Sequence, residues 1–306
     1  MVYKRVDYLK QAIDSLRQSD FDPKRVPIIV SIDGHVQDMI DYVKSLETEF
    51  LVKVLIHPYS CHDHPDSFPG DDETLNKNYA GDQFGNKRSS WATCCKHHFT
   101  WMFKTVFELE EMKQAQGFFF TEEDYVMAPN FYETIARGMR MLLVDKVESP
   151  DQDGFFGIGM DPSNGHAQAS RTAEPTNGFT PKPFVTGPMV LARDVFQKFL
   201  LHGRDYCVFD DYNWDWSLVH LQGNRFLPNL LLMPTRAQTK HIGVEGGMHE
   251  MSAAKQKRMN GMEFEREFHA RELYPARHVP QRKVPKGFGG WGHPADHEHC
   301  RKVLGV

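Results

Sequence analysis

The stretch Gly117-Phe118-Phe119-Phe120-Thr121-Glu122-Glu123-Asp124 places three consecutive carboxylates directly after a short apolar run. The apolar run predicts a buried strand. Ligands of open α/β sheets bind at the carboxyl ends of strands, so the three acids are expected at a site. Adjacent carboxylates repel one another unless a cation neutralises them, and their oxygens suit Mg²⁺ or Mn²⁺. The alternative is a solvated acidic patch, the usual meaning of a charge run.

The segments around this stretch predict an α/β fold. Residues 26–31 and 51–56 have the apolar, β-branched character of buried strands, and the apolar spacing from Met39 to Leu46 predicts a helix between them. This strand–helix–strand order favours parallel strands joined by a crossover helix. Further helices are expected near residues 8–16, 96–113, 131–139, 195–201 and 212–221, and further strands at 155–158, 189–191 and 230–233.

Three segments are expected to lie outside the core because they are polar. Residues 58–90 and 161–183 predict long loops. From Lys240 onward the chain is polar, basic and rich in glycine, so we expect this tail to wrap the surface of the domain rather than contribute to its core.

The composition of the 306-residue chain narrows its class. A formal net charge of -5 gives no basic footprint for nucleic acid. No apolar run is long enough for a transmembrane helix, and no secretory signal is visible. The first residues lead directly into a helical pattern, although an α/β domain should begin with a fuller strand. We therefore expect a strand to be missing before Met1.

A second acidic cluster, Asp210-Asp211-Tyr212-Asn213-Trp214-Asp215-Trp216, sets carboxylates between aromatic rings. This combination is suited to a sugar ring and its hydroxyls. If residues 212–221 are helical, Asp211 and Asp215 lie four residues apart and share a helix face. The alternative is that Asp215 only caps a helix or pairs with an arginine. The two acidic clusters together predict a metal-dependent enzyme that acts on a nucleotide sugar.

Three weaker signals have ordinary structural alternatives. Asp33 ends a predicted strand and could accept hydrogen bonds from a base or ribose, but Asp-Gly is also a strong turn signal. His241 could complete an Mn²⁺ shell, but it is one of 16 histidines. Lys96-His97-His98 is interpreted as the polar first turn of a helix, with Trp101 in the core.

Other chemistries are not favoured by the sequence. It contains no GxSxG elbow, no P-loop and no GxGxxG loop after a strand. A pair of carboxylates also allows a glycoside hydrolase, but three contiguous acids at a strand end suit a metal better. None of the five cysteines shows CxxC spacing, and the composition leaves the redox compartment and the state of Cys61, Cys94 and Cys95 open.

Motifs along nearly the whole chain resemble one glycosyltransferase family. Residues 210–216 match its DDYNWDW motif in full, and residues 289–292 match its GGWG motif. The family is α-1,6-mannosyl-glycoprotein 2-β-N-acetylglucosaminyltransferase (GlcNAc-transferase II). GlcNAc-transferase I is a more distant relative, with EDD at its metal site and no DDYNWDW. Further similar segments are residues 2–9, 31–34, 58–60, 67–70, 82–88, 96–101, 122–124, 241–249 and 296–300.

The resemblance implies a GT-A fold, a Rossmann-like nucleotide-sugar-binding fold with a mixed central sheet. It implies one catalytic domain over residues 1–306, with an N-terminal strand, membrane anchor and stem missing. It also implies inverting transfer of GlcNAc from UDP-GlcNAc to the 2-hydroxyl of the α-1,6-arm mannose of a glycoprotein N-glycan, in the Golgi lumen. The missing anchor would be the only membrane contact. The alternatives are a related β-1,2-GlcNAc-transferase with another acceptor, or a non-catalytic carbohydrate-binding GT-A domain.

The resemblance also implies roles for individual residues. Asp215 would be the catalytic base, and Mn²⁺ would be the cofactor. Cys207 and Cys300 would form a disulfide. The implied metal ligands are Asp124 and His241, the implied donor-binding residues are Arg5, Asp33, Glu122 and Glu123, and the implied acceptor-binding residues are Asp211 and Trp214.

Overall fold

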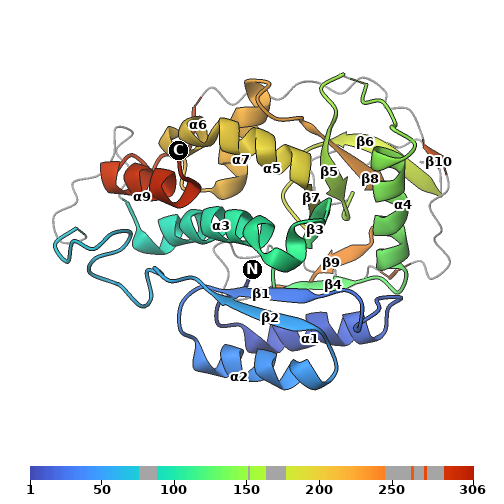
Figure 1. Ribbon diagram of the computed structural model, residues 1–306, viewed down its shortest axis with the longest axis horizontal. Helices are drawn as coiled ribbons and strands as arrows, with labels where there is room; N and C mark the ends of the chain where they lie inside the picture. The colour runs from blue at the N-terminus through green and yellow to red at the C-terminus, as the bar shows by residue number, and fades with distance from the viewer. Residues whose placement is uncertain (76–87, 151, 163–176, 245–262, 265–271, 274–285) are drawn as a thin grey trace.

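The computed structural model describes residues 1–75, 88–150, 152–162, 177–244, 263–264, 272–273 and 286–306, and it shows a layered α/β arrangement (Figure 1). Strands β1 (Ile28–Ile32) and β2 (Val52–Ile56) form one layer. Helices α1 (Val6–Arg17) and α2 (Gln37–Ser45) cover one side of this layer, and α3 (Ser90–Glu108) lies on the other side. The predicted α/β class is confirmed.

The β1–α2–β2 unit is parallel, as its sequence pattern predicts. Ile28 pairs with Val52 and Ile32 with Ile56, in continuous register. The apolar faces of α1 and α2 pack on these strands in one hydrophobic cluster. Because β1 and β2 run in the same direction, Asp33, just after β1, lies at the carboxyl edge of this small sheet.

The central sheet is mixed and has the order β10-β6-β8-β5-β7-β3 among the described residues. The neighbours β10 and β6, and also β8 and β5, are parallel; the other pairs are antiparallel. The mixed sheet that we expected is confirmed. Its strands are β3 (Gly117–Phe120), β5 (Phe155–Gly159), β6 (Gly178–Pro183), β7 (Met189–Ala192), β8 (Leu230–Pro234) and β10 (Glu272–Leu273).

Helices pack around this sheet and α3 to form the largest hydrophobic cluster. Phenylalanines of α3, such as Phe103, pack against those of α5, such as Phe199, with ring centroids 5.2 Å apart. The other elements are α4 (Phe131–Leu143), α5 (Arg193–Leu201), α6 (Gly203–Val208), α7 (Trp214–Gly223), α9 (Pro294–Leu304) and the 3₁₀ helices η1 (Leu46–Thr48) and η2 (Glu110–Met112).

A short antiparallel pair of strands positions residues of the candidate site. β4 (Tyr125–Met127) pairs with β9 (Thr239–His241), and Tyr125 lies opposite His241. Asp124 therefore stands at the start of β4 next to the end of β9, although more than a hundred residues separate the two strands in the sequence.

Part of the predicted loop 161–183 is a strand instead. β6 occupies residues 178–183 and pairs antiparallel with β8 along its whole length. Pro181 and Pro183 conceal it in the sequence because proline cannot donate to a strand ladder. β10 pairs only with Gly178 and Phe179, so neither proline has to donate on that side.

The expectation that the C-terminal tail would stay out of the core is wrong for its end. Trp291 and Cys300 are 0% exposed and Leu304 is 3% exposed, all within the largest cluster. Helix α9 begins with Pro294 at its first turn and ends before Gly305, whose φ of 76° favours glycine. The predicted disulfide between Cys207 on α6 and Cys300 on α9 is confirmed, with the Cα atoms 5.6 Å apart.

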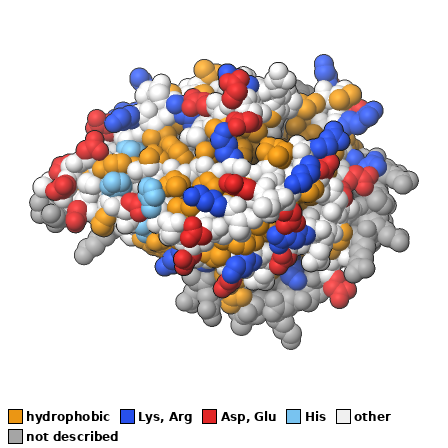
Figure 2. Space-filling model, turned by 60° about the horizontal axis from the view of Figure 1, so that its bottom comes forward, with side chains coloured by type: hydrophobic (Ala, Val, Ile, Leu, Met, Phe, Trp, Pro, Cys, Tyr) orange, Lys and Arg blue, Asp and Glu red, His pale blue; other side chains and the backbone are white. Residues whose placement is uncertain are grey.

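The face of the molecule that Figure 2 shows carries charges of both signs among hydrophobic side chains. Within the described residues, none of the helices has both the length and the hydrophobicity that crossing a bilayer requires.

Candidate active site

Asp124 contacts the other predicted metal ligand, His241, and also contacts Arg5. Its Oδ2 atom lies 3.3 Å from His241 Nε2 and 2.8 Å from Arg5 Nη2. Arg5 Nε also donates to Glu123 Oε1, at 2.8 Å. The predicted proximity of Asp124 and His241 is confirmed; their role as metal ligands stays a prediction.

The backbone brings Asp124 and His241 together. Ile242 N donates to the carbonyl oxygen of Asp124 at 2.8 Å, which extends the β4–β9 pairing by one step. A Cβ atom at Gly243 would lie 2.3 Å from Asp124 Oδ2. Glycine at this position therefore leaves the space that the carboxylate occupies.

Among the described residues, two polar atoms at this junction are buried without a hydrogen-bond partner: Asp124 Oδ1 and His241 Nδ1. Burial raises the pKa of Asp124, but the contact with His241 and the Arg5 guanidinium outweigh it and lower that pKa. The group is therefore a carboxylate at neutral pH. A charged oxygen without a partner, beside an imidazole, is a donor set that fits a divalent cation.

Glu122 is the most strongly perturbed acid of the first cluster. Burial, followed by the charges of Asp124 and Glu123, raises its pKa to about 8. A positive charge nearby would favour its ionised form. The first acidic cluster is therefore no solvated patch, since Glu123 and Asp124 are buried and Glu122 is half-buried.

Asp33 lies past β1 with both carboxylate oxygens in contact with other side chains. His57 Nδ1 is 2.9 Å from Oδ1, and Cys94 Sγ is 3.1 Å from Oδ2. Burial would raise the pKa of Asp33, but the hydrogen bond with His57 and the charge of His98 hold it well below its usual range. Asp33 is thus a fixed, ionised group at the strand end.

Asp215 sits in the first turn of α7, where Thr186 donates a hydrogen bond to Oδ2. Burial raises the pKa of this carboxyl group. The expectation that Asp211 shares a helix face with Asp215 is wrong, because α7 begins only at Trp214 and Asn213 precedes it in an extended conformation.

Trp214 belongs to the core. It is 5% exposed, and its ring stacks on Phe99 with centroids 4.1 Å apart. Trp216, which the sequence reasoning did not single out, is half-buried and meets the exposed ring of Phe288 edge to face at 5.2 Å. Of the two tryptophans of α7, Trp216 thus has the more accessible face.

The two most specific motifs form one structural unit. Asp211 Oδ2 accepts from Phe288 N at 3.0 Å, and its Oδ1 accepts from the backbone of Asn213 at 2.9 Å. Asp210 Oδ1 accepts from Trp291 N, also at 2.9 Å. These carboxylates fold the glycine-rich loop of residues 286–292 onto the segment before α7.

Helix α3 begins at Ser90 and buries Lys96, His97 and His98 within it, so their interpretation as a polar first turn is wrong. Trp101, expected in the core, is only half-buried. Lys96 Nζ donates to the carbonyl oxygen of Asp211 at 2.9 Å and lies 4.1 Å from the centre of the Trp291 ring. The partner of Lys96 is thus distant in the sequence, and no local pattern reveals it.

His97 belongs to a buried network with Asp296 on α9. His97 Nε2 is 2.9 Å from Asp296 Oδ1, and Arg88 Nε donates to Oδ2 at 2.6 Å. His98 Nε2 lies 2.7 Å from Ser31 Oγ on β1. Helix α3 therefore ties the β1 edge to the C-terminal helix through polar side chains.

Four predicted site residues act electrostatically on one thiol of α3. Burial raises the pKa of Cys95 most, and the charges of Glu122, Asp33, Asp215 and Glu123 raise it further. The sequence contained a signal for each acid, but none for Cys95 or Thr186.

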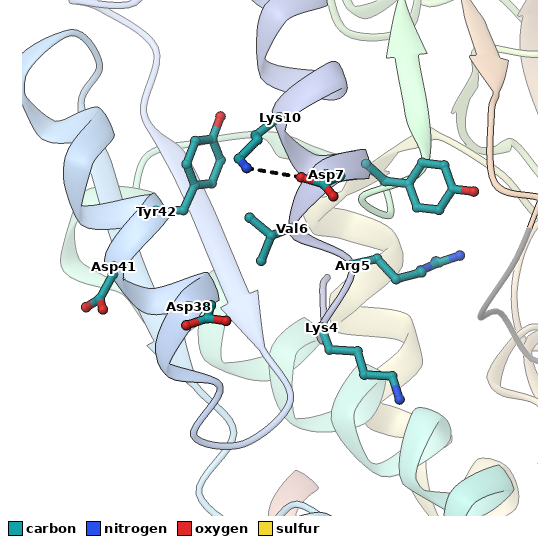
Figure 3. Close-up of a pocket in the computed structure, with 9 residues that line it drawn as sticks. Lys4, Arg5, Val6, Asp7, Lys10, Asp38, Asp41 and Tyr42 are labelled. Carbon is teal, nitrogen blue, oxygen red and sulfur yellow. Dashed lines mark hydrogen bonds and ion pairs between the residues drawn. The ribbon is translucent and has the colours of Figure 1, made fainter.

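A groove of about 660 Å³ opens between α1 and α2 (Figure 3). On its α1 side, Lys10 donates to Asp7 at 3.0 Å. Arg5 extends away from Asp38 and Asp41, which stand on α2. Of the predicted site residues, only Arg5 lines this groove, so it lies next to the acidic site and does not contain it.

Comparisons with known proteins identify the family of this chain. The family model described as N-acetylglucosaminyltransferase II (MGAT2) matches residues 1–300. An alpha-1,6-mannosyl-glycoprotein 2-beta-N-acetylglucosaminyltransferase from Rattus norvegicus is 27% identical over 98% of this chain and 72% of its own length. Proteins of the same name are 31% identical in Arabidopsis thaliana, over 81% of this chain and 58% of the relative, and 27% identical in Homo sapiens, over 98% and 71%. The chain belongs to the N-acetylglucosaminyltransferase II family.

Proposed function

We propose that this protein transfers GlcNAc from UDP-GlcNAc to the 2-hydroxyl of the α-1,6-arm mannose of glycoprotein N-glycans, inverting the donor linkage to β-1,2. Family membership and the names of the relatives support this reaction. The structural observation that carries the proposal is the junction of Asp124, His241 and Arg5, where charged and unpartnered ligand atoms meet at strand ends.

A GT-A fold is consistent with the architecture. The parallel β1–α2–β2 unit resembles half of a nucleotide-binding fold, and the acids lie at the carboxyl edges of β1 and β3. We assign the uridine side of the donor to Arg5 and Asp33. Glu122 and Glu123 would shape the site or contact the donor, with Glu123 holding Arg5 in place.

The residues present fit the Mn²⁺ that the family implies. Asp124 and His241 would hold it, through the unpartnered Asp124 Oδ1 and a ring nitrogen of His241. When bound, the ion would neutralise negative charge on the diphosphate of the donor. The Arg5 guanidinium, 2.8 Å from Asp124, would add fixed positive charge at the same place.

We assign the base to Asp215. Its carboxylate would accept the proton of the mannose 2-hydroxyl while that oxygen bonds to the anomeric carbon, and the bond from this carbon to UDP breaks with the electron pair leaving on UDP. The raised pKa makes Asp215 a stronger base than an exposed aspartate. The hydrogen bond from Thr186 orients the carboxylate.

The acceptor side is assigned to the segment around α7. Trp214 and Asp211 would support the acceptor side indirectly. Trp214 packs in the core, and Asp211 binds the backbone of the loop 286–292. The accessible rings of Trp216 and Phe288 are better placed to contact a sugar directly. The Cys207–Cys300 bridge supports an oxidising compartment, and we place the protein in the Golgi lumen.

The test is an assay with UDP-GlcNAc, Mn²⁺ and a set of defined N-glycans. We expect one GlcNAc to be added in β-1,2 linkage to the α-1,6-arm mannose, and activity to be lost with EDTA and restored by Mn²⁺. Transfer to the α-1,3-arm instead would refute the acceptor assignment. Mn²⁺-dependent binding of UDP without any turnover would refute the catalytic assignment and favour a binding domain.

A further inference from the structure

A second group of potential metal ligands lies outside the acidic junction. Cys61 and His62 belong to the loop after β2, and Cys94 lies in the first part of α3. One ligand atom from each residue, two thiol sulfurs and an imidazole nitrogen, lies within 4.8 Å of the others. Cys61 and Cys94 are 7% and 2% exposed, so the two sulfurs are enclosed by protein.

A fourth ligand group stands next to this cluster. Asp33 Oδ2 lies 3.1 Å from Cys94 Sγ and 4.0 Å from His62 Nε2. We propose that Cys61, His62 and Cys94, with Asp33 as the fourth ligand, form a binding site for Zn²⁺.

The dimensions of the cluster fit a small tetrahedral ion. Zinc bonds of about 2.3 Å to sulfur and about 2.0 Å to nitrogen place ligand atoms roughly 3.5–3.8 Å apart. The thiol and imidazole atoms are already within 4.8 Å of one another, so rotation of side chains would close the shell. Two thiolates and an imidazole select zinc over the hard cations Mg²⁺ and Mn²⁺.

The surroundings shift the pKa values of the two thiols in opposite directions. Cys61 N donates to Cys94 Sγ at 3.1 Å. The hydrogen bond between the Cys61 and Cys94 thiols lowers the pKa of Cys61 to about 7, although burial acts in the opposite direction. His62 lowers this pKa further. Burial raises the pKa of Cys94, so its proton would be released when the ion binds.

The His62 ring is held in position from outside the cluster. It stacks on Tyr3 with centroids 3.8 Å apart and an interplanar angle of 9°, and it meets the edge of Trp91 at 5.5 Å. The His62 side chain is 21% exposed, which leaves a path from solvent to the site.

The consequence for activity rests on the proposed function. Asp33 would serve two sites, the uridine side of the donor and the zinc shell. Bound Zn²⁺ would fix Asp33 away from the donor, so zinc would weaken UDP binding. The metal site itself stands independently of that role, since it can be measured without UDP.

The experiment uses the full chain, freed of metal and kept under a mild reductant that leaves the buried Cys207–Cys300 disulfide intact, with Co²⁺ as a spectroscopic probe for the zinc site. Because only thiolate ligands give an intense near-ultraviolet sulfur-to-cobalt charge-transfer band, a site made of Asp124 and His241 would not produce it. We expect this band together with the visible bands of tetrahedral cobalt, at one Co²⁺ per chain, and their loss on adding one equivalent of Zn²⁺.

Matched variants locate the ligands. Cys61→Ser and Cys94→Ser should abolish the charge-transfer band or weaken Zn²⁺ binding at least about tenfold. His62→Ala, at a partly exposed side chain, tests the site without disturbing a buried thiol. Cys95→Ser is the control, because Cys95 neighbours Cys94 in sequence but lies outside the cluster; it should keep the band.

Three results would overturn the proposal. The first is no thiolate band with Co²⁺, and the second is an equal band in Cys61→Ser and wild type. The third is a Cys61–Cys94 disulfide that resists the mild reductant and excludes metal. Donor binding with and without one equivalent of Zn²⁺ then tests the shared use of Asp33. If the band is present but UDP-GlcNAc is never turned over, the zinc site stands and the proposed function fails.

Discussion

Two acid-rich regions of this protein use their carboxylates in opposite ways. At the β3–β4 junction, Asp124 has a buried Oδ1 atom that finds no partner in the part of the chain that the structure describes. At the segment before α7, both oxygens of Asp211 accept hydrogen bonds from the chain's own backbone. An ionised oxygen left unpartnered is costly unless a ligand completes it, whereas one that binds N–H groups holds a loop in place. Acid content alone therefore does not indicate a ligand site, whereas an ionised oxygen without a partner among the described residues favours one.

The largest effect is expected from Asp124→Asn, which removes the charge from the junction. The turnover number should fall at least about 10³-fold, because both Mn²⁺ and Arg5 contact this carboxylate in the proposed site. This loss is larger than the loss of turnover that follows removal of one hydrogen-bond donor at an active site. Steady-state kinetics with isothermal titration of Mn²⁺ would measure it. Unchanged turnover at saturating Mn²⁺ would place the metal elsewhere.

Asp215→Asn should have the next largest effect. It keeps the shape and the contact with Thr186 but removes the basicity, so turnover should fall by at least about a hundredfold while UDP binding is retained. The wild-type rate should decline on acidification with a midpoint above the ordinary aspartate pKa, because burial raises the pKa of Asp215. Near-normal turnover of the variant would reject the assignment and turn attention to Asp211.

Acidification should lower the stability of the protein because it weakens the buried polar network between α3 and α9. Burial lowers the pKa of His97 to about 4, whereas an unfolded histidine takes up its proton near 6.5. The unfolded state therefore binds the proton first, and the stability contribution is lost as the pH falls from about 6.5 towards 4. The free energy of unfolding should drop by on the order of 3 kcal/mol at most.

Urea unfolding at a series of pH values measures this loss, and His97→Gln is the matched control. The amide nitrogen of glutamine takes the place of Nε2 and can donate to Asp296 but does not titrate, so the decline over this interval should become shallower. An identical slope in the variant would assign the decline to other groups.

Asp211→Asn should give the smallest effect and complete the comparison. It replaces one of two acceptor oxygens with a donor, so the partly buried backbone N–H of Phe288 or Asn213 loses this hydrogen bond. We expect a loss of about 1.5–2 kcal/mol of stability by urea unfolding. Turnover per folded molecule should change far less than in Asp124→Asn. A collapse of turnover in a fully folded protein would show that Asp211 acts on substrate.

The sequence alone determined the elements whose burial follows a local rule. The β1–α2–β2 unit, α3 and the apolar strands β3, β5, β7 and β8 follow from runs and spacings of apolar residues. Glu122, Glu123 and Asp124 could be assigned to a site because a buried strand must release them at its end. The resemblance further predicted the contact of Asp124 with His241 and the bridge between Cys207 and Cys300.

Only the tertiary structure decided which polar groups are buried. His97 and Asp296 are 199 positions apart, and Lys96 reaches the carbonyl oxygen of Asp211 across 115 positions. A sequence window of one helix or strand contains no trace of such partners, so Lys96-His97-His98 and the C-terminal tail were predicted to be exposed. Burial of a charged or polar side chain depends on the group that satisfies it, and here the fold supplies that group from a distant part of the chain.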